Sequence, residues 1–178
     1  MTFDKAVPVE ASSWWALAAF VGLNFAAAST GAAFKPGDWY AALQKPTWTP
    51  PNWAFPLVWM VLYCTIAAAG WLVWEEASTA ALPALAFYVV SLGFNAAWSV
   101  LFFGMRRLDW AMLEVLAFWL SIMAVIVVFA PIRPVAAFLL IPYLAWVTVA
   151  ALLNLRLLQL NGGRGPTLSR QSLKVEVG

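Results

Sequence analysis

Residues 108–130, LDWAMLEVLAFWLSIMAVIVVFA, are apolar over nearly their whole length. A helix of this length covers about 30 Å, which is the thickness of the hydrocarbon core of a bilayer. Four further stretches have the same character. They are residues 13–34, 52–74, 80–104 and 134–158. The sequence therefore predicts an all-α membrane protein, a bundle of five transmembrane helices.

The composition fits a membrane protein and excludes several other classes. Of the 178 residues, 64% are hydrophobic and only 10% are charged, against about 25% in soluble domains. A net charge of +2 with so little polar surface excludes a nucleic-acid partner. The absence of histidine excludes His-ligated metals and haem, and the single cysteine, Cys64, lies in an apolar run where we expect a small hydrophobe and not a reactive thiol. We expect no metal site and no required cofactor.

Pro, Gly and charged residues separate the five stretches, so residues 1–160 are expected to form one domain. Residues 161–178 are rich in Gly, Ser and Arg, which predicts a disordered tail. The first stretch has an alternative interpretation as a signal peptide, because the alanines at 26–28 resemble a cleavage site. Against it, the residues before Ser13 are not basic, and the apolar run continues to Phe34.

Lysine and arginine are unequally divided between the two sides of the predicted membrane. One side holds the loops after the first and third helices and the C-terminal tail. It carries Lys35, Lys45, Arg106, Arg107, Arg156, Arg164, Arg170 and Lys174, whereas the other side carries Lys5 and Arg133. The positive-inside rule then places the N-terminus outside and the C-terminus in the cytoplasm, and it leaves the identity of the membrane open.

The loop at residues 35–51 is longer than most connections without a function. It contains Trp39 and Trp48 together with three prolines that stiffen its backbone. We expect an ordered lid over one end of the bundle. The alternative is an aromatic anchor at the membrane interface.

Three of the twelve tryptophans are expected deep in the membrane. Trp59, Trp98 and Trp146 lie about 9 to 15 Å from the cytoplasmic ends of their helices, at 1.5 Å per residue. Asn95, one turn from Trp98, supplies a polar group at the same depth. These residues predict a flat, aromatic and sparsely polar pocket for a rigid planar ligand, with ordinary helix packing as the alternative.

Glu114 is the only carboxylate inside a predicted span. Asp109, at the start of the same helix, is expected to cap it. Intramembrane carboxylates are functional candidates by default, although Glu114 could also favour the positive end of its helix.

The motifs resemble the TspO/translocator family, also called tryptophan-rich sensory proteins or peripheral-type benzodiazepine receptors. The resemblance covers residues 31–161 and recurs in order on the expected helices. It is carried by WYAALQKPTWTPP at residues 39–51, NAAW at 95–98 and PYLAW at 142–146.

The resemblance implies a five-helix bundle, usually a homodimer in membrane lipid, that binds porphyrins such as protoporphyrin IX. It also implies cholesterol and benzodiazepine-type ligands in some members, but Leu155 stands where the sterol motif needs a tyrosine, so sterol recognition is not carried over. By motif position the implied ligand residues are Trp39, Trp48, Trp53, Trp59, Asn95, Trp98, Trp110, Trp146 and Ala150.

Three functions are compatible with this resemblance. The first is a porphyrin-binding membrane sensor or transport-related protein. The second is an enzyme for light- and oxygen-dependent breakdown of protoporphyrin IX, in which Trp59 and Trp146 would be catalytic because indoles are oxidisable. The third is a membrane scaffold that regulates a partner. Neither the physiological ligand nor any signalling partner is specified by these motifs.

Overall fold

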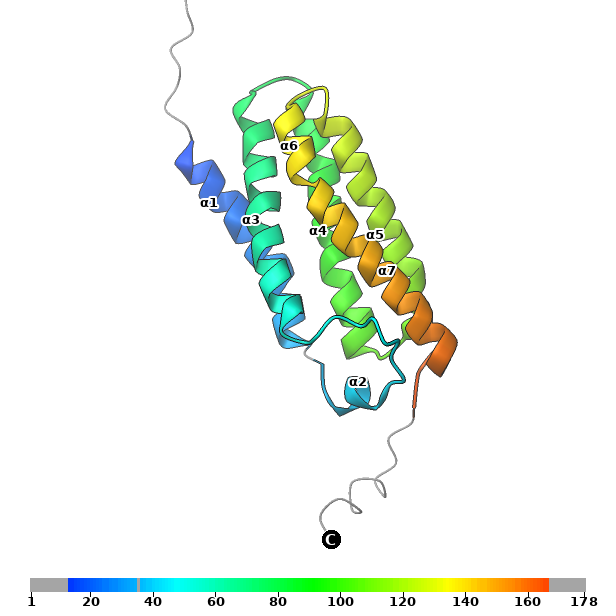
Figure 1. The fold of residues 1–178 in the computed structure, drawn as a ribbon. Helices are drawn as coiled ribbons and strands as arrows, with labels where there is room; N and C mark the ends of the chain where they lie inside the picture. The colour runs from blue at the N-terminus through cyan, green and yellow to red at the C-terminus, as the bar shows by residue number, and fades with distance from the viewer. Residues whose placement is uncertain (1–12, 35, 167–178) are drawn as a thin grey trace, which may run out of the picture.

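The computed structural model describes residues 13–34 and 36–166, which form helices and their connections without any strand in those ranges. Five spans are long and apolar enough to cross a membrane (Figure 1). They are α1 (Trp14–Ala33), α3 (Ala54–Glu75), α4 (Ala81–Ser99) continued by η1 (Val100–Gly104), α5 (Leu108–Phe129), and α6 (Pro134–Leu139) continued by α7 (Ile141–Asn161). The predicted all-α fold with five spans is confirmed, as expected of a multi-pass integral membrane protein.

Two spans are less regular than the sequence predicts. The third ends in a turn of π-helix, η1, immediately before the basic loop at Arg106. The fifth is interrupted at Leu140, between α6 and α7. The interruption has a clear cause, because Pro142 has no N–H to donate to the preceding turn and its ring crowds the carbonyl four residues earlier.

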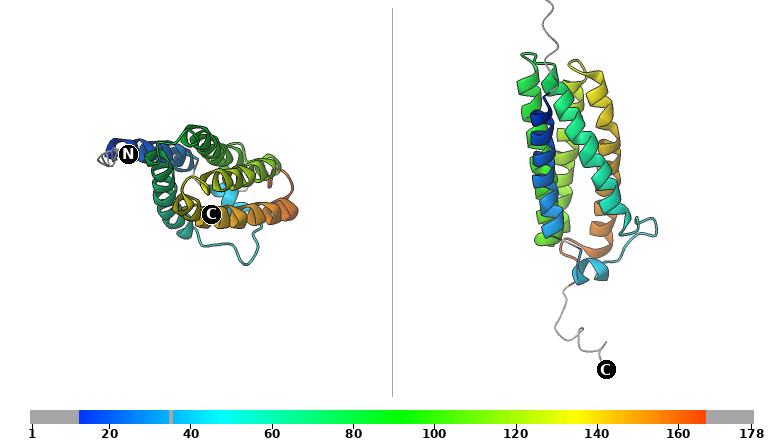
Figure 2. Two further views of the ribbon diagram at one scale, coloured as in Figure 1. Left: turned by 90° about the horizontal axis from the view of Figure 1, so that it is seen from above. Right: turned by 90° about the vertical axis from the view of Figure 1, so that its left-hand side faces the viewer.

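The helices form a closed bundle with α1 on its outside (Figure 2). Helix α1 packs on α3 and α4, α4 packs on α5, and α5 packs on α6 and α7. Helix α3 closes the circle mainly through α6, whereas α7 runs away from it (Figure 1). The facing sides of α3 and α7 therefore separate toward one end of the bundle.

That end carries the connection between α1 and α3, here called the lid segment (residues 36–53), and the C-terminal residues 161–166 (Figure 1). We call it the lid end and the opposite one the far end. The lid segment contains a short helix, α2 (Asp38–Ala42).

Close contacts between small and aromatic residues hold the far half of the bundle together. Phe20 and Tyr88 meet edge to face at 5.6 Å, and Tyr88 stacks on Phe129 at 6.3 Å. Gly70 allows this approach, since a Cβ there would lie 2.7 Å from Phe20 Cδ1 and 3.1 Å from Tyr88 Cζ. Lipid tails are as apolar as leucine, so such packing, and not expulsion from water, associates the helices.

Candidate functional site

An aromatic cluster occupies the separating faces of α3 and α7. Trp59 stacks on Tyr63 with ring centroids 5.3 Å apart, and its edge meets Tyr143 at 6.1 Å. Closer to the lid end, Phe55 meets Trp146 at 5.6 Å. Trp59 and Trp146 are half-buried, so these two indoles keep part of their surface accessible.

A polar centre lies behind these rings. The Asn95 side chain of α4 is buried, and its Oδ1 accepts a hydrogen bond of 2.8 Å from the Tyr63 hydroxyl. Its Nδ2 donates to the Tyr143 hydroxyl at 3.2 Å. One asparagine thus ties α3, α4 and α7 together, as hydrogen-bonded polar groups do inside membranes. A single polar group in an aromatic wall also fixes the orientation of a bound ligand.

Trp98 continues the aromatic lining toward the lid. It stacks on Phe102 with centroids 4.7 Å apart and contacts the edge of Phe103 at 5.8 Å. Phe102 in turn meets Trp39 of the lid segment at 5.9 Å. Aromatic contacts therefore run without a break from α4 through η1 to the lid.

The lid segment is held by the C-terminal residues, in an arrangement we call the clasp. Trp39 Nε1 donates to the Arg164 carbonyl at 3.0 Å. Asn161 bonds the backbone of Gln44 twice, accepting from its N–H at 2.8 Å and donating to its carbonyl at 2.9 Å. Gly165 has φ +67°, and a Cβ there would lie 2.7 Å from Leu43 Cδ2. A glycine is thus required where the chain passes the lid.

The clasp also caps α5. The backbone N–H groups of Leu108 and Asp109 donate to the Gly163 carbonyl at 2.8 and 3.4 Å. The expectation that Asp109 caps this helix is wrong, because the N-cap is Arg107 and Asp109 lies in the first turn. The Asp109 carboxylate instead pairs with the Arg107 guanidinium at 2.6 Å, which raises the pKa of Arg107.

The first residues of the tail that was expected to be disordered are part of the clasp. Residues 161–166 are bonded to the lid and to α5, and residues 167–178 lie outside the described part of the chain. Inside the lid, the Lys45 ammonium donates to the carbonyls of Ala41 and Leu43 and lies 4.7 Å from the centre of the Tyr40 ring. Burial lowers the pKa of Lys45 and raises the pKa of Tyr40. The expected ordered segment is present, and its buried side chains are Trp39, Tyr40 and Leu43.

Comparison with known proteins identifies the family to which this architecture belongs. Residues 15–160 match the TspO/MBR family. The chain belongs to that family. Protein CrtK of Rhodobacter capsulatus is 41% identical over 142 residues, which cover 79% of this chain and 89% of that protein. The tryptophan-rich sensory protein of Cereibacter sphaeroides is 40% identical over 151 residues, covering 84% and 94%, and the translocator protein of Ovis aries is 41% identical over 129 residues, covering 71% and 76%.

The structure divides the nine ligand positions implied by the TspO/MBR resemblance into two groups. One group lies in the packed interior of the lid half or in the lid itself, namely Trp39, Trp59, Asn95, Trp98 and Trp146, and Ala150 on α7 is half-buried. The other three are largely exposed, with 47% of the surface of Trp48, 69% of Trp53 and 51% of Trp110 accessible. Trp110 lies under the Arg107 guanidinium at 4.9 Å. Trp48 and Trp53 belong to the lid segment, so they reach a ligand only if that segment folds inward.

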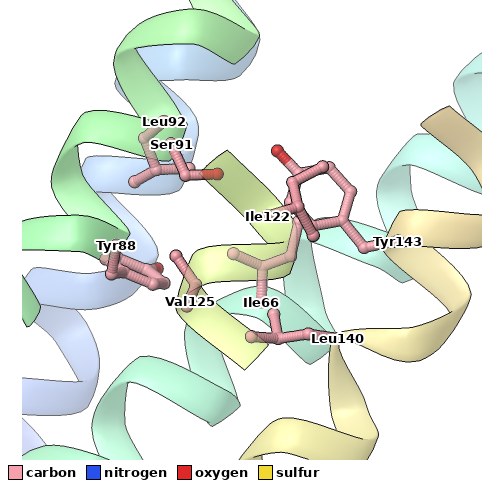
Figure 3. A pocket seen from close by; sticks show the side chains of 8 residues that line it. All are labelled: Ile66, Tyr88, Ser91, Leu92, Ile122, Val125, Leu140 and Tyr143. Carbon is pink, nitrogen blue, oxygen red and sulfur yellow. The ribbon is translucent and has the colours of Figure 1, made fainter. Parts of the chain in front are cut away.

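The two main hollows do not coincide with these nine positions. An enclosed cavity of about 10 Å³ lies between α3, α4, α5 and α7, where Tyr88, Ser91 and Tyr143 face the same space (Figure 3). It has room for about one water molecule. An open groove of about 480 Å³ lies on the outside between α4 and α5 at the far end, lined by apolar residues such as Phe87 and Val127. Neither hollow contains any of the nine positions.

Two tyrosines belong to the aromatic cluster but not to the predicted set. Tyr63 and Tyr143 supply the hydroxyls that bond Asn95. Tyr63 lies four residues after Trp59, and Tyr143 lies three residues before Trp146, so each tyrosine shares a helix face with its tryptophan. This spacing is a signal by which both tyrosines could have been predicted from the sequence. The clasp residues Asn161 and Arg164 gave no comparable signal, since their partners are 117 and 125 residues away in the chain.

Proposed function

We propose that this protein is a membrane sensor that binds a porphyrin-type tetrapyrrole between α3, α4 and α7, under the lid segment. The observation that carries the proposal is the aromatic cluster of Phe55, Trp59 and Trp146 around the Asn95 centre. Flat aromatic walls with one fixed polar group suit a rigid planar ligand. A relative 40% identical over most of the chain is named a tryptophan-rich sensory protein, which supports the sensory part of the proposal.

Binding requires a change of shape. Neither hollow described above lies at the aromatic cluster, so we expect a macrocycle to gain space there when α3 and α7 separate further beneath a displaced lid. Helix α3 packs less extensively on α7 than on α1 or α6, so separating α3 from α7 disrupts mainly the aromatic contacts between them. The ligand then stabilises the open state to the extent that it binds the open state more tightly than the closed state.

Tryptophan fluorescence provides the test. Protoporphyrin IX should quench the emission of the purified protein saturably, in detergent and in lipid nanodiscs. Trp146→Phe keeps aromatic area but removes the indole N–H and part of the wall, so its dissociation constant should rise by about tenfold, or 1.4 kcal/mol. Trp15→Phe is the control, because Trp15 is exposed at the far end and should leave affinity unchanged.

A second variant, Trp53→Phe, tests whether the lid segment contacts the bound ligand. If the lid folds inward over the ligand, this exposed residue becomes a contact and its replacement weakens binding. If the lid stays outside, affinity is unchanged. Unsaturable quenching in both media, or a normal affinity of Trp146→Phe, would contradict a site at the aromatic cluster.

Illumination under air separates a sensor from the enzyme alternative. A sensor binds protoporphyrin and leaves its Soret band unchanged. Catalytic loss of that band, abolished by replacing Trp59 or Trp146, would instead assign the degradation of protoporphyrin to this protein.

A further inference from the structure

Three polar side chains inside the lid half have no hydrogen-bond partner among the described residues. Both carboxylate oxygens of Glu114 on α5 are buried without one. Asn154 on α7 is 0% exposed, and neither its Nδ2 nor its Oδ1 is bonded. Trp98 Nε1 on α4 is buried and unbonded as well. We call these residues the Glu114 layer.

The antiparallel register of α5 and α7 places Glu114 and Asn154 at one level. Trp119 Nε1 bonds Thr148 Oγ1 at 2.9 Å, and the Leu108 N–H bonds the Gly163 carbonyl at 2.8 Å. Counting from these two contacts, the residue opposite Glu114 lies within 153–157, a range that includes Asn154.

Asn154 is fully buried on the face of α7 that carries the buried Leu153 and Leu157. Glu114 is half-buried and lies beside the buried face of α5 that carries Ala111 and Val115, with both of its carboxyl oxygens buried. Trp98 reaches the same packed cluster, in which Phe102, Ala111, Leu153 and Leu157 are buried together. Three helices thus carry buried, unpaired polar atoms in the lid half of the bundle.

The layer is acidic and lacks a cation of its own. The two ion pairs among the described residues join Arg107 to Asp109 and Arg133 to Glu76, so neither involves Glu114. An ionisable group inside a membrane is almost always paired, because an uncompensated charge there is costly. The layer contains two unbonded N–H donors, Asn154 Nδ2 and Trp98 Nε1, but no described cation pairs with the Glu114 carboxyl group.

We propose that the Glu114 layer is a binding subsite for the ammonium group of a lipophilic amine. The carboxylate supplies the opposite charge, the Asn154 oxygen accepts a second N–H, and the rings of Trp98 and Phe102 offer faces to the cation and to its apolar body. This inference does not depend on tetrapyrrole binding, since it uses Glu114 and Asn154, which lie outside the predicted porphyrin set.

Dansylcadaverine is a suitable probe, because it joins a primary amine to an apolar fluorophore that accepts energy from tryptophan. The full-length protein in phosphatidylcholine nanodiscs is titrated with this probe and with its neutral N-acetyl derivative, and empty nanodiscs measure partition into lipid. The wild-type protein should bind the amine at least about tenfold more tightly than the acetamide, the ratio expected of one charge-assisted hydrogen bond.

Two variants test the residues. Glu114→Gln should remove the preference for the amine, and Asn154→Leu, similar in volume but apolar, should weaken amine binding severalfold while keeping part of the preference. Glu76→Gln is the matched control. The Glu76 carboxylate lies in the far-end loop, so its replacement should leave the affinities for the amine and for the acetamide unchanged. Quenching by protoporphyrin IX, measured on the same samples, reports separately on the aromatic cluster.

Equal affinity of the wild-type protein for the amine and the acetamide would overturn the proposal without any variant. A preference that persists in Glu114→Gln would overturn it as well, because the charge would then come from elsewhere. If Glu114→Gln fails to fold, Asn154→Leu decides the question in its place: severalfold weaker binding of the amine supports the subsite, and unchanged affinity for the amine overturns it.

Discussion

The far half and the lid half of the bundle pack their helices in different ways. In the far half, glycine and aromatic residues approach closely, and the Asn24 amide donates to the Tyr88 hydroxyl at 2.6 Å, although Asn24 Oδ1 and Trp71 Nε1 are unbonded among the described residues. In the lid half, α3 and α7 separate, and both Glu114 and Asn154 keep their polar atoms unpaired. The close contacts of the far half stabilise the fold. The unpaired polar atoms of the lid half lower its stability, and a ligand that bonds to them would restore it.

If the proposed ligand binds at the lid end, one small bundle serves as both a scaffold and a receptor. Tight packing at one end holds the helices in register, so that the other end can open without loss of the fold. Binding energy gained at the lid end is then available to change the lid and the C-terminal residues that clasp it.

The largest expected effect concerns which side of the membrane each half faces. The distribution of lysine and arginine predicts that the lid end is cytoplasmic. An impermeant thiol reagent should fail to label Arg164→Cys in intact cells and should label it after permeabilisation, in a Cys64→Ala background.

Arg164 is the better position for this label, because its side chain is exposed, whereas any side chain at Gly165 would collide with Leu43. Labelling of intact cells would reverse the orientation and place the lid outside.

The next prediction tests how closely the far half is packed. In Gly70→Ala the added Cβ meets Phe20 and Tyr88 at less than van der Waals distance. Overpacking of this kind costs about 1 to 3 kcal/mol, so the midpoint of thermal unfolding in detergent should fall clearly. Gly93→Ala is the control, since nothing lies within 4 Å of a Cβ at that glycine. Equal midpoints for the two variants would show that the far half is loosely packed.

The smallest effect tests the clasp. Asn161→Ala removes two hydrogen bonds to Gln44, which together contribute about 1 to 2 kcal/mol. The lid should open about five- to thirtyfold more often, and chymotryptic cleavage after Tyr40, which is buried in the closed lid, should accelerate by a similar factor. Saturating protoporphyrin should slow this cleavage if ligand binding orders the lid.

Gln159→Ala is the matched control for this measurement, since the Gln159 side chain bonds only Arg156 among the described residues. Cleavage of Asn161→Ala at the wild-type rate would mean that Trp39 and its neighbours hold the lid without the C-terminal residues.

The sequence predicts the spans well because their signal is local. Every apolar stretch became a membrane-length helix, and the interruption before Ile141 follows from Pro142. The pairing of Trp59 with Tyr143 and of Phe55 with Trp146 is not predictable in the same way. In a membrane helix the residues that face lipid are as apolar as those that face protein, so the hydrophobic pattern does not reveal the rotation of each helix.

The amino-acid sequence by itself determined the five spans, the family and the kinds of residue available for binding, because hydrophobic length and motif spacing are properties of the chain alone. Only the tertiary structure decided that Trp39 bonds the Arg164 carbonyl, that Trp48 and Trp53 are exposed, and that Glu114 shares a level with Asn154. The physical reason is that these relations depend on the register and rotation of helices distant in the chain. Packing and interhelical hydrogen bonds fix that register only when the whole bundle has assembled.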